Sequence, residues 1–435
     1  MPRFPETVKN TLTRIVSDMA KSPEAFVRNP SADFTRDRML NFENTVSLIL
    51  SMGSASINRE LLDYFQYVSP SVPSASAFVQ RRAKILPDAF RTLFLRFNSC
   101  FAESSSLDGF RLLACDGTDL DFHGSPADAE YYFIPGNASV GCCTIHVNAL
   151  YSLCSRRYVD AVIQPCHGKD DFRAFCDMVD RTPQEEAGKT IFITDRGFAS
   201  LNVYAHVIEK GAFFLIRAKE TEAVKLAGQL TGEFDTAAHV TLVRRRIPQV
   251  RSNPEVRFVW KGCSFDFLAY GAEGTYEMSL RVVCIRLPGA PYEYLVTNLP
   301  ADRFPPDILK ELYYRRWGVE TSFRELKYAI GLSAFHCRKP DFVIQEIWAR
   351  LTLYNFCELI TSHVAVEQKH TKHVYQLNYT MAIQICHSFL KILPSAYQPD
   401  VETLIGRYLL PVRKERDYKR KVKPRHAVSF LYRLA

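Results

Sequence analysis

The stretch Tyr313–Lys327, YYRRWGVETSFRELK, has the residue types that metal-assisted phosphate chemistry requires. Read as a helix at about 100° per residue, it places Tyr313, Arg316, Glu320 and Lys327 on one narrow stripe. A carboxylate flanked by cations suits a site that holds a metal ion and a phosphate. A surface helix with ordinary charge pairs is the alternative, so the hypothesis requires partner carboxylates elsewhere in the chain.

Two aspartates, Asp116 and Asp195, occur in the same local setting. Each follows a short apolar segment that predicts a strand (RLLAC and IFIT), and each is followed by a glycine within two residues. In α/β sheets, functional groups gather at the carboxyl ends of strands. If the two strands are neighbours, both carboxylates face one crevice, and Glu320 completes a set of three. Asp119 and Asp121 are alternatives to Asp116 as the first carboxylate of this set.

Three carboxylates in one place repel each other unless divalent cations neutralise them. Oxygen ligands suit Mg²⁺ or Mn²⁺, so we predict that Asp116, Asp195 and Glu320 are catalytic metal ligands. Two such ions, about 3.5–4 Å apart, can clamp the attacking and leaving oxygens of a phosphodiester.

Phosphate contacts are expected from Tyr313, Arg316 and Lys327, which share the helical stripe with the glutamate. A second basic segment lies near the end of the chain, where residues 413–425 include eight basic and two acidic side chains. A solvated tail is the alternative, but the chemistry already requires a polyanion, so we predict DNA contacts from this segment. Its predicted contact residues are Arg413, Lys414, Lys419, Arg420, Lys421 and Lys423.

The elements that must position these residues indicate an α/β fold with a mixed sheet. Strands alternate with helices after a hairpin at 143–164, and extended segments dominate 240–297, including 264–270. Helices are predicted before residue 100, one of which carries Arg81, Arg82 and Lys84 on a face that suits a DNA groove or solvent.

The predicted units are a helical DNA-binding domain (1–105), the first part of the catalytic core (106–220), a β-rich insertion (221–300), the second part of the core with the Glu320 helix (301–365), and a C-terminal helical region with the basic tail (366–435).

Composition narrows the class of protein. The 435 residues include 47% hydrophobic and 23% charged residues, with a net charge of +8, as in a globular protein. The twelve cysteines form no C-x-x-C pair, which argues against a structural zinc site. No secretory pattern begins the sequence and no apolar run reaches membrane-spanning length, so we expect a reducing cytoplasm and no membrane contact.

These residues also resemble a known family. The spacing of Tyr313, Arg316, Glu320 and Lys327 is similar to the Tyr-Arg-Glu-Lys signature of DDE transposases, and more closely to the bacterial insertion-sequence-four family. Asp116-Gly-Thr and Asp195-Arg-Gly resemble its two Asp motifs, and YLVTNL at 294–299 resembles its strand before the final helices. The resemblance runs from roughly residue 112 to residue 332.

The resemblance implies a ribonuclease-H-like core with a β-rich insertion, two Mg²⁺ ions, and nicking of DNA followed by 3′-OH strand transfer. It assigns metal binding to Asp116, Asp195 and Glu320, with phosphate contacts from the rest of the signature. The binding partners that the resemblance implies are the inverted-repeat ends of a transposon and target DNA, which a homodimer binds in a synaptic complex. Some members stack a flipped base on a Trp, but here the strand before Thr297 has none and Trp260 lies elsewhere in the insertion.

Two other functions stay open at this point. One is a ribonuclease-H-like nuclease or resolvase that hydrolyses DNA without strand transfer, and the other is an inactive DNA-binding protein. Among single residues, Trp317 is expected to pack in the core and His146 to be a structural histidine. Arg196 is expected to neutralise Asp195 or to contact a phosphate.

Overall fold

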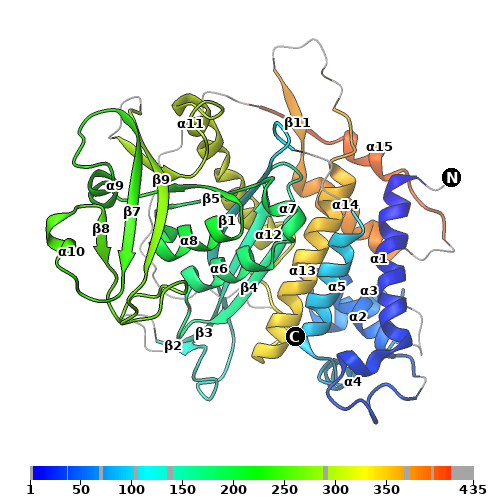
Figure 1. Ribbon diagram of the computed structural model, residues 1–435. Coiled ribbons are helices and arrows are strands. Elements are labelled where there is room, and N and C mark those ends of the chain that lie inside the picture. Colours follow the sequence, from blue (N-terminus) through cyan, green and yellow to red (C-terminus); the bar gives the residue numbers. More distant parts are fainter. Residues whose placement is uncertain are drawn as a thin grey trace.

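The computed structural model describes residues 3–36, 38–67, 72–101, 106–134, 141–287, 292–366, 368, 373–392 and 396–412. These form a helical body on one side of the molecule and a large β-sheet on the other (Figure 1). The predicted α/β fold with a mixed sheet is confirmed.

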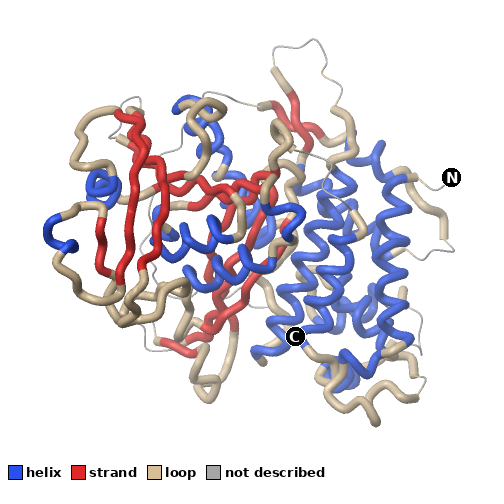
Figure 2. Tube along the Cα trace, viewed as in Figure 1, coloured by secondary structure: helices blue, strands red, loops and turns tan. Residues whose placement is uncertain are grey.

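The helical body packs around α13 (Pro340–Thr361), which is buried along almost its whole length. Apolar residues occur on every side of this helix, which is typical of a core helix. Helices from both ends of the chain lie around it (Figure 2) and share one hydrophobic core with it: α1 (Phe4–Lys21), α2 (Phe42–Ser51), α3 (Ile57–Tyr64), α4 (Ala75–Arg82), α5 (Pro87–Ser99), α14 (Tyr379–Lys391) and α15 (Val401–Gly406). None of the described helices is both long and apolar enough to cross a membrane.

The large sheet has ten strands in the described part of the chain, in the order β2-β3-β1-β5-β6-β10-β9-β7-β8, with β4 also paired to β3. The strands β1, β3 and β4 are antiparallel neighbours, whereas β5 and β6 run parallel to β1. The bounds are β1 (Arg111–Phe122), β2 (Tyr132–Phe133), β3 (Cys142–Ser152), β4 (Tyr158–Pro165), β5 (Thr190–Thr194), β6 (Phe213–Arg217), β7 (Phe234–Val243), β8 (Val256–Phe258), β9 (Thr275–Ile285) and β10 (Glu293–Thr297).

Helices cover both faces of the sheet. On one face, α6 (Asp171–Arg181) and α8 (Leu201–Glu209) pack on inward residues such as Leu113 and Phe192. On the other face, α11 (Pro306–Arg315) and α12 (Trp317–Tyr328) pack on residues such as Leu112 and Ala114. Shorter elements are η1 (Pro23–Phe26), α7 (Gln184–Ala187), η2 (Arg196–Phe198), α9 (Glu220–Leu226), α10 (Gln249–Ser252), and the pair β11 (Tyr375–Leu377) with β12 (Leu409–Pro411).

The predicted β-rich insertion extends the main sheet, because β9 pairs with β10 and β10 pairs with β6. The strand predicted at 264–270 is wrong; this segment is a loop. Its carbonyl groups find another donor, since the buried Arg244 guanidinium donates to the carbonyls of Phe265 (2.9 Å) and Cys263 (3.2 Å). One arginine therefore satisfies backbone groups that a strand would pair in a ladder.

Candidate active site

The strands β1 and β5 bring Asp116 and Asp195 side by side. Their parallel register pairs Cys115 with Thr194, so Asp116 is the next residue of β1 and Asp195 is the first residue after the end of β5. On β1, Asp116 shares its face with Ala114, on the side covered by α11 and α12, and the charge of Asp195 acts on both Asp116 and Tyr313 of α11. The sequence predicted that β1 ends before Asp116, but the strand continues to Phe122, because β3 pairs with it over that length.

Asp116 is in an environment that opposes its ionisation. Burial raises the pKa of Asp116 to about 6, although the Gly117 N–H and Arg316 oppose the rise. The negative charges of Asp195 and Glu320 raise this pKa further, so both carboxylates act on Asp116 across the same space. Gly117 donates its N–H to the Asp116 carboxylate at 2.9 Å, which fixes the side chain beside the strand.

The helical stripe predicted for Tyr313–Lys327 is divided between two helices. α11 ends at Arg315 and α12 begins at Trp317, with Arg316 between them. The Arg316 N–H donates to the Tyr313 carbonyl at 3.1 Å, so the chain turns tightly there. Glu320 therefore lies in the first turn of α12, where the helix dipole favours a carboxylate.

Arg316 is a buried cation that holds the glutamate. It is 5% exposed and donates to the Glu320 carboxylate at 2.9 Å. Its guanidinium lies 5.7 Å from the Tyr313 ring centre and 5.0 Å from the Trp317 ring centre. Burial disfavours its charge, but Tyr313, Glu320 and Asp116 raise the pKa of Arg316 above its usual range. A buried, fully charged donor next to two carboxylates is suited to a phosphate.

The other two residues of the signature lie at the ends of the same region. Tyr313 is buried in the last turn of α11, and burial raises the pKa of its hydroxyl, which keeps it a donor at neutral pH. Lys327 reaches across to β1, where its amine donates to the Asp119 carbonyl at 3.1 Å. Lys327 therefore approaches the strand three residues beyond Asp116.

The donor set fits a hard divalent cation. Asp116, Asp195 and Glu320 all offer carboxylate oxygens, and the pKa of Asp116 is raised first by burial and further by the charges of the other two. Within the described ranges, however, no three or more His, Cys, Asp or Glu side chains lie close enough to hold a metal ion together. Glu320 is bound by Arg316 instead. The three carboxylates thus share one side of the sheet without converging on a point.

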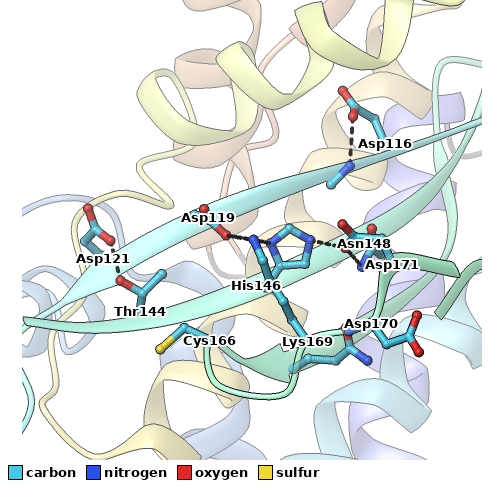
Figure 3. A network of polar contacts seen from close by, with 12 residues as sticks. Asp116, Asp119, Asp121, Thr144, His146, Asn148, Cys166, Lys169, Asp170 and Asp171 are labelled. Carbon is cyan, nitrogen blue, oxygen red and sulfur yellow. Dashed lines mark hydrogen bonds and ion pairs between the residues drawn. The ribbon is translucent and has the colours of Figure 1, made fainter. Parts of the chain in front are cut away.

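The competing aspartates lie on the opposite face of β1. Asp119 and Asp121 alternate with Asp116 along the strand and pair with β3 (Figure 3). Thr144 donates to Asp121 at 2.6 Å, and the carboxylate of Asp119 lies 2.6 Å from Nδ1 of His146. The hydrogen bond from the histidine lowers the pKa of Asp119. Both carboxylates are therefore satisfied away from Asp195 and Glu320.

His146 is a structural histidine, as its sequence context predicted. It is 5% exposed, with Nδ1 at 2.6 Å from Asp119 and Nε2 at 2.7 Å from Asp171 (Figure 3). Burial opposes its charge, but these two carboxylates raise the pKa of His146 to about 9. It also explains the glycine after Asp116, because a Cβ on Gly117 would lie 2.7 Å from Nε2 of His146.

Two expectations about basic and aromatic residues are wrong. Trp317, expected in the core, is 49% exposed. The expectation of a basic face in a DNA groove or in solvent is wrong for Arg82 of α4, which is 1% exposed and donates to Glu346 at 2.8 Å. Lys84, just after this helix, has a side chain that is 35% exposed and pairs with Asp33 at 2.7 Å. Helical periodicity could not reveal the burial of Arg82, because Glu346 is 264 residues away in the sequence.

The predicted tail contacts Arg413, Lys414, Lys419, Arg420, Lys421 and Lys423 lie outside the described residues.

Two basic residues near Asp195, Lys219 and Arg257, were not predicted from the sequence as site residues. Together with Arg196 they line a cavity of about 300 Å³ that begins one residue after Asp195. The only feature of the sequence that could have indicated this cavity was the position of Lys219 just beyond an apolar strand.

Comparison with known proteins finds a matching family model, a curated relative and solved structures of similar fold. A family model described as "Transposase DDE domain" matches residues 108–356. Over 188 residues, the chain is 27% identical to "Transposase InsG for insertion sequence element IS4" from Escherichia coli (strain K12), covering 41% of this chain and only 39% of that protein's length. A solved structure, "Cryo-EM structure of piggyBac transposase synaptic complex with hairpin DNA (SNHP)", is 12% identical with a TM-score of 0.44, covering 89% of this chain and 80% of the other.

Proposed function

This chain belongs to the DDE transposase family, whose domain model matches more than half of its 435 residues, and from that premise we propose that it is the transposase of a bacterial insertion sequence. The reaction proposed is metal-dependent cleavage of DNA at the element's ends, followed by attack of the freed 3′-OH on target DNA. The supporting observation is geometric: Asp116 and Asp195 come at matching positions of the adjacent strands β1 and β5, and Glu320 lies on α12, which packs on the same face of the sheet.

Asp116, Asp195 and Glu320 are the proposed ligands of two Mg²⁺ ions, for which Mn²⁺ can substitute. When bound by these carboxylates, the ions would supply activation of water and neutralisation of the charge on the phosphodiester. The protein's contribution is position: two ligands are fixed by the register of adjacent strands, and the third by the first turn of α12.

The proposed phosphate grip is Arg316, Lys327 and Tyr313. Arg316 has a buried Nε atom with no hydrogen-bond partner among the described residues, so this donor is available to a phosphate oxygen. Lys327 would act as a point charge and Tyr313 as a neutral hydroxyl donor. Together these groups would orient the DNA strand so that the scissile phosphate faces the three carboxylates.

The proposed partners are the two inverted-repeat ends of the element and a target duplex, bound by a homodimer in the synaptic complex. The proposed location is the bacterial cytoplasm, consistent with twelve free thiols. We expect DNA affinity to fall steeply with salt, and truncation at Arg413 should flatten that slope, because each lost phosphate contact lowers it by about one. An unchanged slope in a filter-binding titration would remove the tail from the interface.

The deciding experiment is a strand-transfer assay with the DNA that flanks the gene as substrate. Full-length protein, Mg²⁺, a duplex with a pre-cut end and a supercoiled target plasmid are incubated together. The proposal predicts that the 3′-OH strand becomes joined to the plasmid. A parallel reaction uses the uncut duplex: cleavage there without joining of the pre-cut end would favour a nuclease or resolvase, and binding without cleavage in Mg²⁺ or Mn²⁺ would favour an inactive DNA-binding protein.

A further inference from the structure

The turn between β3 and β4 places an arginine in an unusual backbone conformation. Arg156 has a φ angle of +57°, in the left-handed region that L-residues with side chains seldom adopt. Such a conformation is energetically unfavourable and persists only where the surroundings fix it. Glycine would occupy the position without that cost, so the arginine side chain itself accounts for the residue found here.

The Arg156 side chain reaches three helices. Its Nε lies 3.2 Å from the Glu358 carboxylate on α13, and its Nη2 lies 3.4 Å from the Glu325 carboxylate on α12. The guanidinium also covers the Tyr379 ring on α14, at 4.0 Å from the ring centre. One cation from the hairpin therefore joins α12, α13 and α14.

This cation neutralises two glutamates that burial would otherwise penalise. The side chains of Glu358 and Glu325 are 3% and 15% exposed. Burial raises the pKa of Glu358 to about 7; Arg156 opposes this rise, whereas Glu325 adds to it. Loss of Arg156 would leave two like charges facing each other in the interior, with no cation from the hairpin between α12 and α13.

The same side of α12 makes two further polar contacts. The Tyr354 hydroxyl donates to Glu325 at 3.0 Å, and the Tyr158 hydroxyl lies 2.9 Å from the Ser322 hydroxyl. Glu320 comes five residues before Glu325, which is about 140° around the helix and roughly 7.5 Å along it. The polar contacts thus lie on one side of α12, whereas Glu320, the proposed metal ligand, projects from a different side of the helix.

We propose that Arg156 is a positioning residue, which fixes the rotation of α12 and thereby directs Glu320 toward Asp116 and Asp195. The inference rests on the proposed function. At a radius of roughly 6 Å, a 10° rotation of a helix displaces a side chain by about 1 Å. A displacement of that size in a catalytic group lowers rate by about 100-fold.

The first test compares Arg156→Met with Arg181→Met. Arg181 is a matched control, because its side chain is 38% exposed against 37% for Arg156 and it also binds a buried carboxylate, Asp160 at 2.8 Å, which lies on β4. We expect R156M to lower the cleavage rate at saturating DNA by 10- to 100-fold with the DNA Kd within twofold of wild type, and R181M to keep both. Arg156→Lys should recover part of the rate, because it retains the charge without the fork. Equal rates for R156M and R181M would overturn the proposal.

A second variant separates positioning from fold stability. Arg156→Met combined with Glu358→Gln keeps the net charge of the cluster and removes the carboxylate that most opposes burial. The proposal predicts that the double variant regains thermal stability but stays slow, since nothing from the hairpin binds Glu325. If the rate recovers together with the stability, Arg156 has only a structural role.

A third readout does not depend on DNA chemistry. The chain has three tryptophans, of which Trp317 lies on α12 three residues before Glu320 and Trp260 lies in the insertion. With 5-fluorotryptophan labelling, R156M should shift or broaden the ¹⁹F resonance of Trp317 and leave that of Trp260 unchanged. An unmoved Trp317 resonance would refute the positioning role. A moved resonance in a protein whose wild type never cleaves DNA would retain the positioning role and reject the proposed function.

Discussion

Replacing Glu358 by glutamine should stabilise the protein relative to wild type, and the gain should be larger at high pH than at low pH. The Glu358 side chain is 3% exposed, and burial raises its pKa from 4.5 to about 7. As pH rises through this window, the unfolded chain loses the proton first, so the native state binds more protons and stability falls. The cost is absent well below pH 4.5 and complete above pH 7.

The size of the effect follows from the two pKa values. With 1.36 kcal/mol per pKa unit, the raised pKa of Glu358 costs about 1 kcal/mol of stability at pH 5 and about 3 kcal/mol at pH 8. Glutamine has nearly the same shape and never ionises. The difference in unfolding free energy between E358Q and wild type should therefore rise by about 2–3 kcal/mol from pH 5 to pH 8.

Urea unfolding at 25 °C, followed by circular dichroism at half-unit pH steps, measures this difference. Glu346→Gln is the matched control: its carboxylate is equally buried, but His336 and Arg82 hold its pKa well below the usual range despite burial. The stability that Glu346 contributes is complete above about pH 5 and is lost only as pH falls below 4.5, so the difference between E346Q and wild type should stay nearly constant from pH 5 to pH 8. A pH-independent difference for E358Q, or a shift of the same sign in both variants, would refute the reasoning.

Three further predictions concern the proposed site and its support. Asp116→Asn, Asp195→Asn and Glu320→Gln should each abolish cleavage in a gel assay and leave DNA binding within a few-fold of wild type, because they remove metal ligands and keep shape. Gly117→Ala should cost about 1–3 kcal/mol in unfolding free energy, because its Cβ would lie 2.7 Å from a buried ring nitrogen. Arg82→Met should cost about 3–5 kcal/mol by leaving a buried carboxylate without its nearest cation, measured by urea unfolding.

The two stability predictions each have a control within the chain. Gly262→Ala should be nearly neutral, because no heavy atom lies within 4 Å of an added Cβ. Arg28→Met removes an exposed ion pair with Asp341 and should change stability by less than about 1 kcal/mol. Activity in any one of the three carboxylate variants would show that the ligand is wrong at that position.

Much of the sheet was predictable, because its patterns are local. The hairpin of β3 and β4 and the strand before Asp195 were visible as short apolar runs with turn residues between them. The continuation of β1 past Asp116 was not, since it depends on β3 pairing along the whole strand. A polar run such as DGTDLD gives no strand signal until that partner is known.

The site was partly predictable for a similar reason. Helical spacing grouped Arg316, Glu320 and Lys327, but it did not show that one helix ends at Arg315 and the next begins at Trp317. The inward turn of Arg82 depends on a glutamate on α13, and the exposure of Trp317 depends on which side of α12 the sheet covers. Such facts come from tertiary packing, which periodicity alone does not contain.

The most direct test of the central claim maps the metal itself. Fe²⁺ replaces Mg²⁺ on the protein–DNA complex, and ascorbate and peroxide are added. The bound Fe²⁺ then produces hydroxyl radicals, which cut the polypeptide backbone close to the ion. We predict cuts around Asp116, Asp195 and Glu320, all suppressed by excess Mg²⁺ and by Glu320→Gln. Cuts around Asp119 without cuts at Asp195 and Glu320 would contradict the proposed metal site.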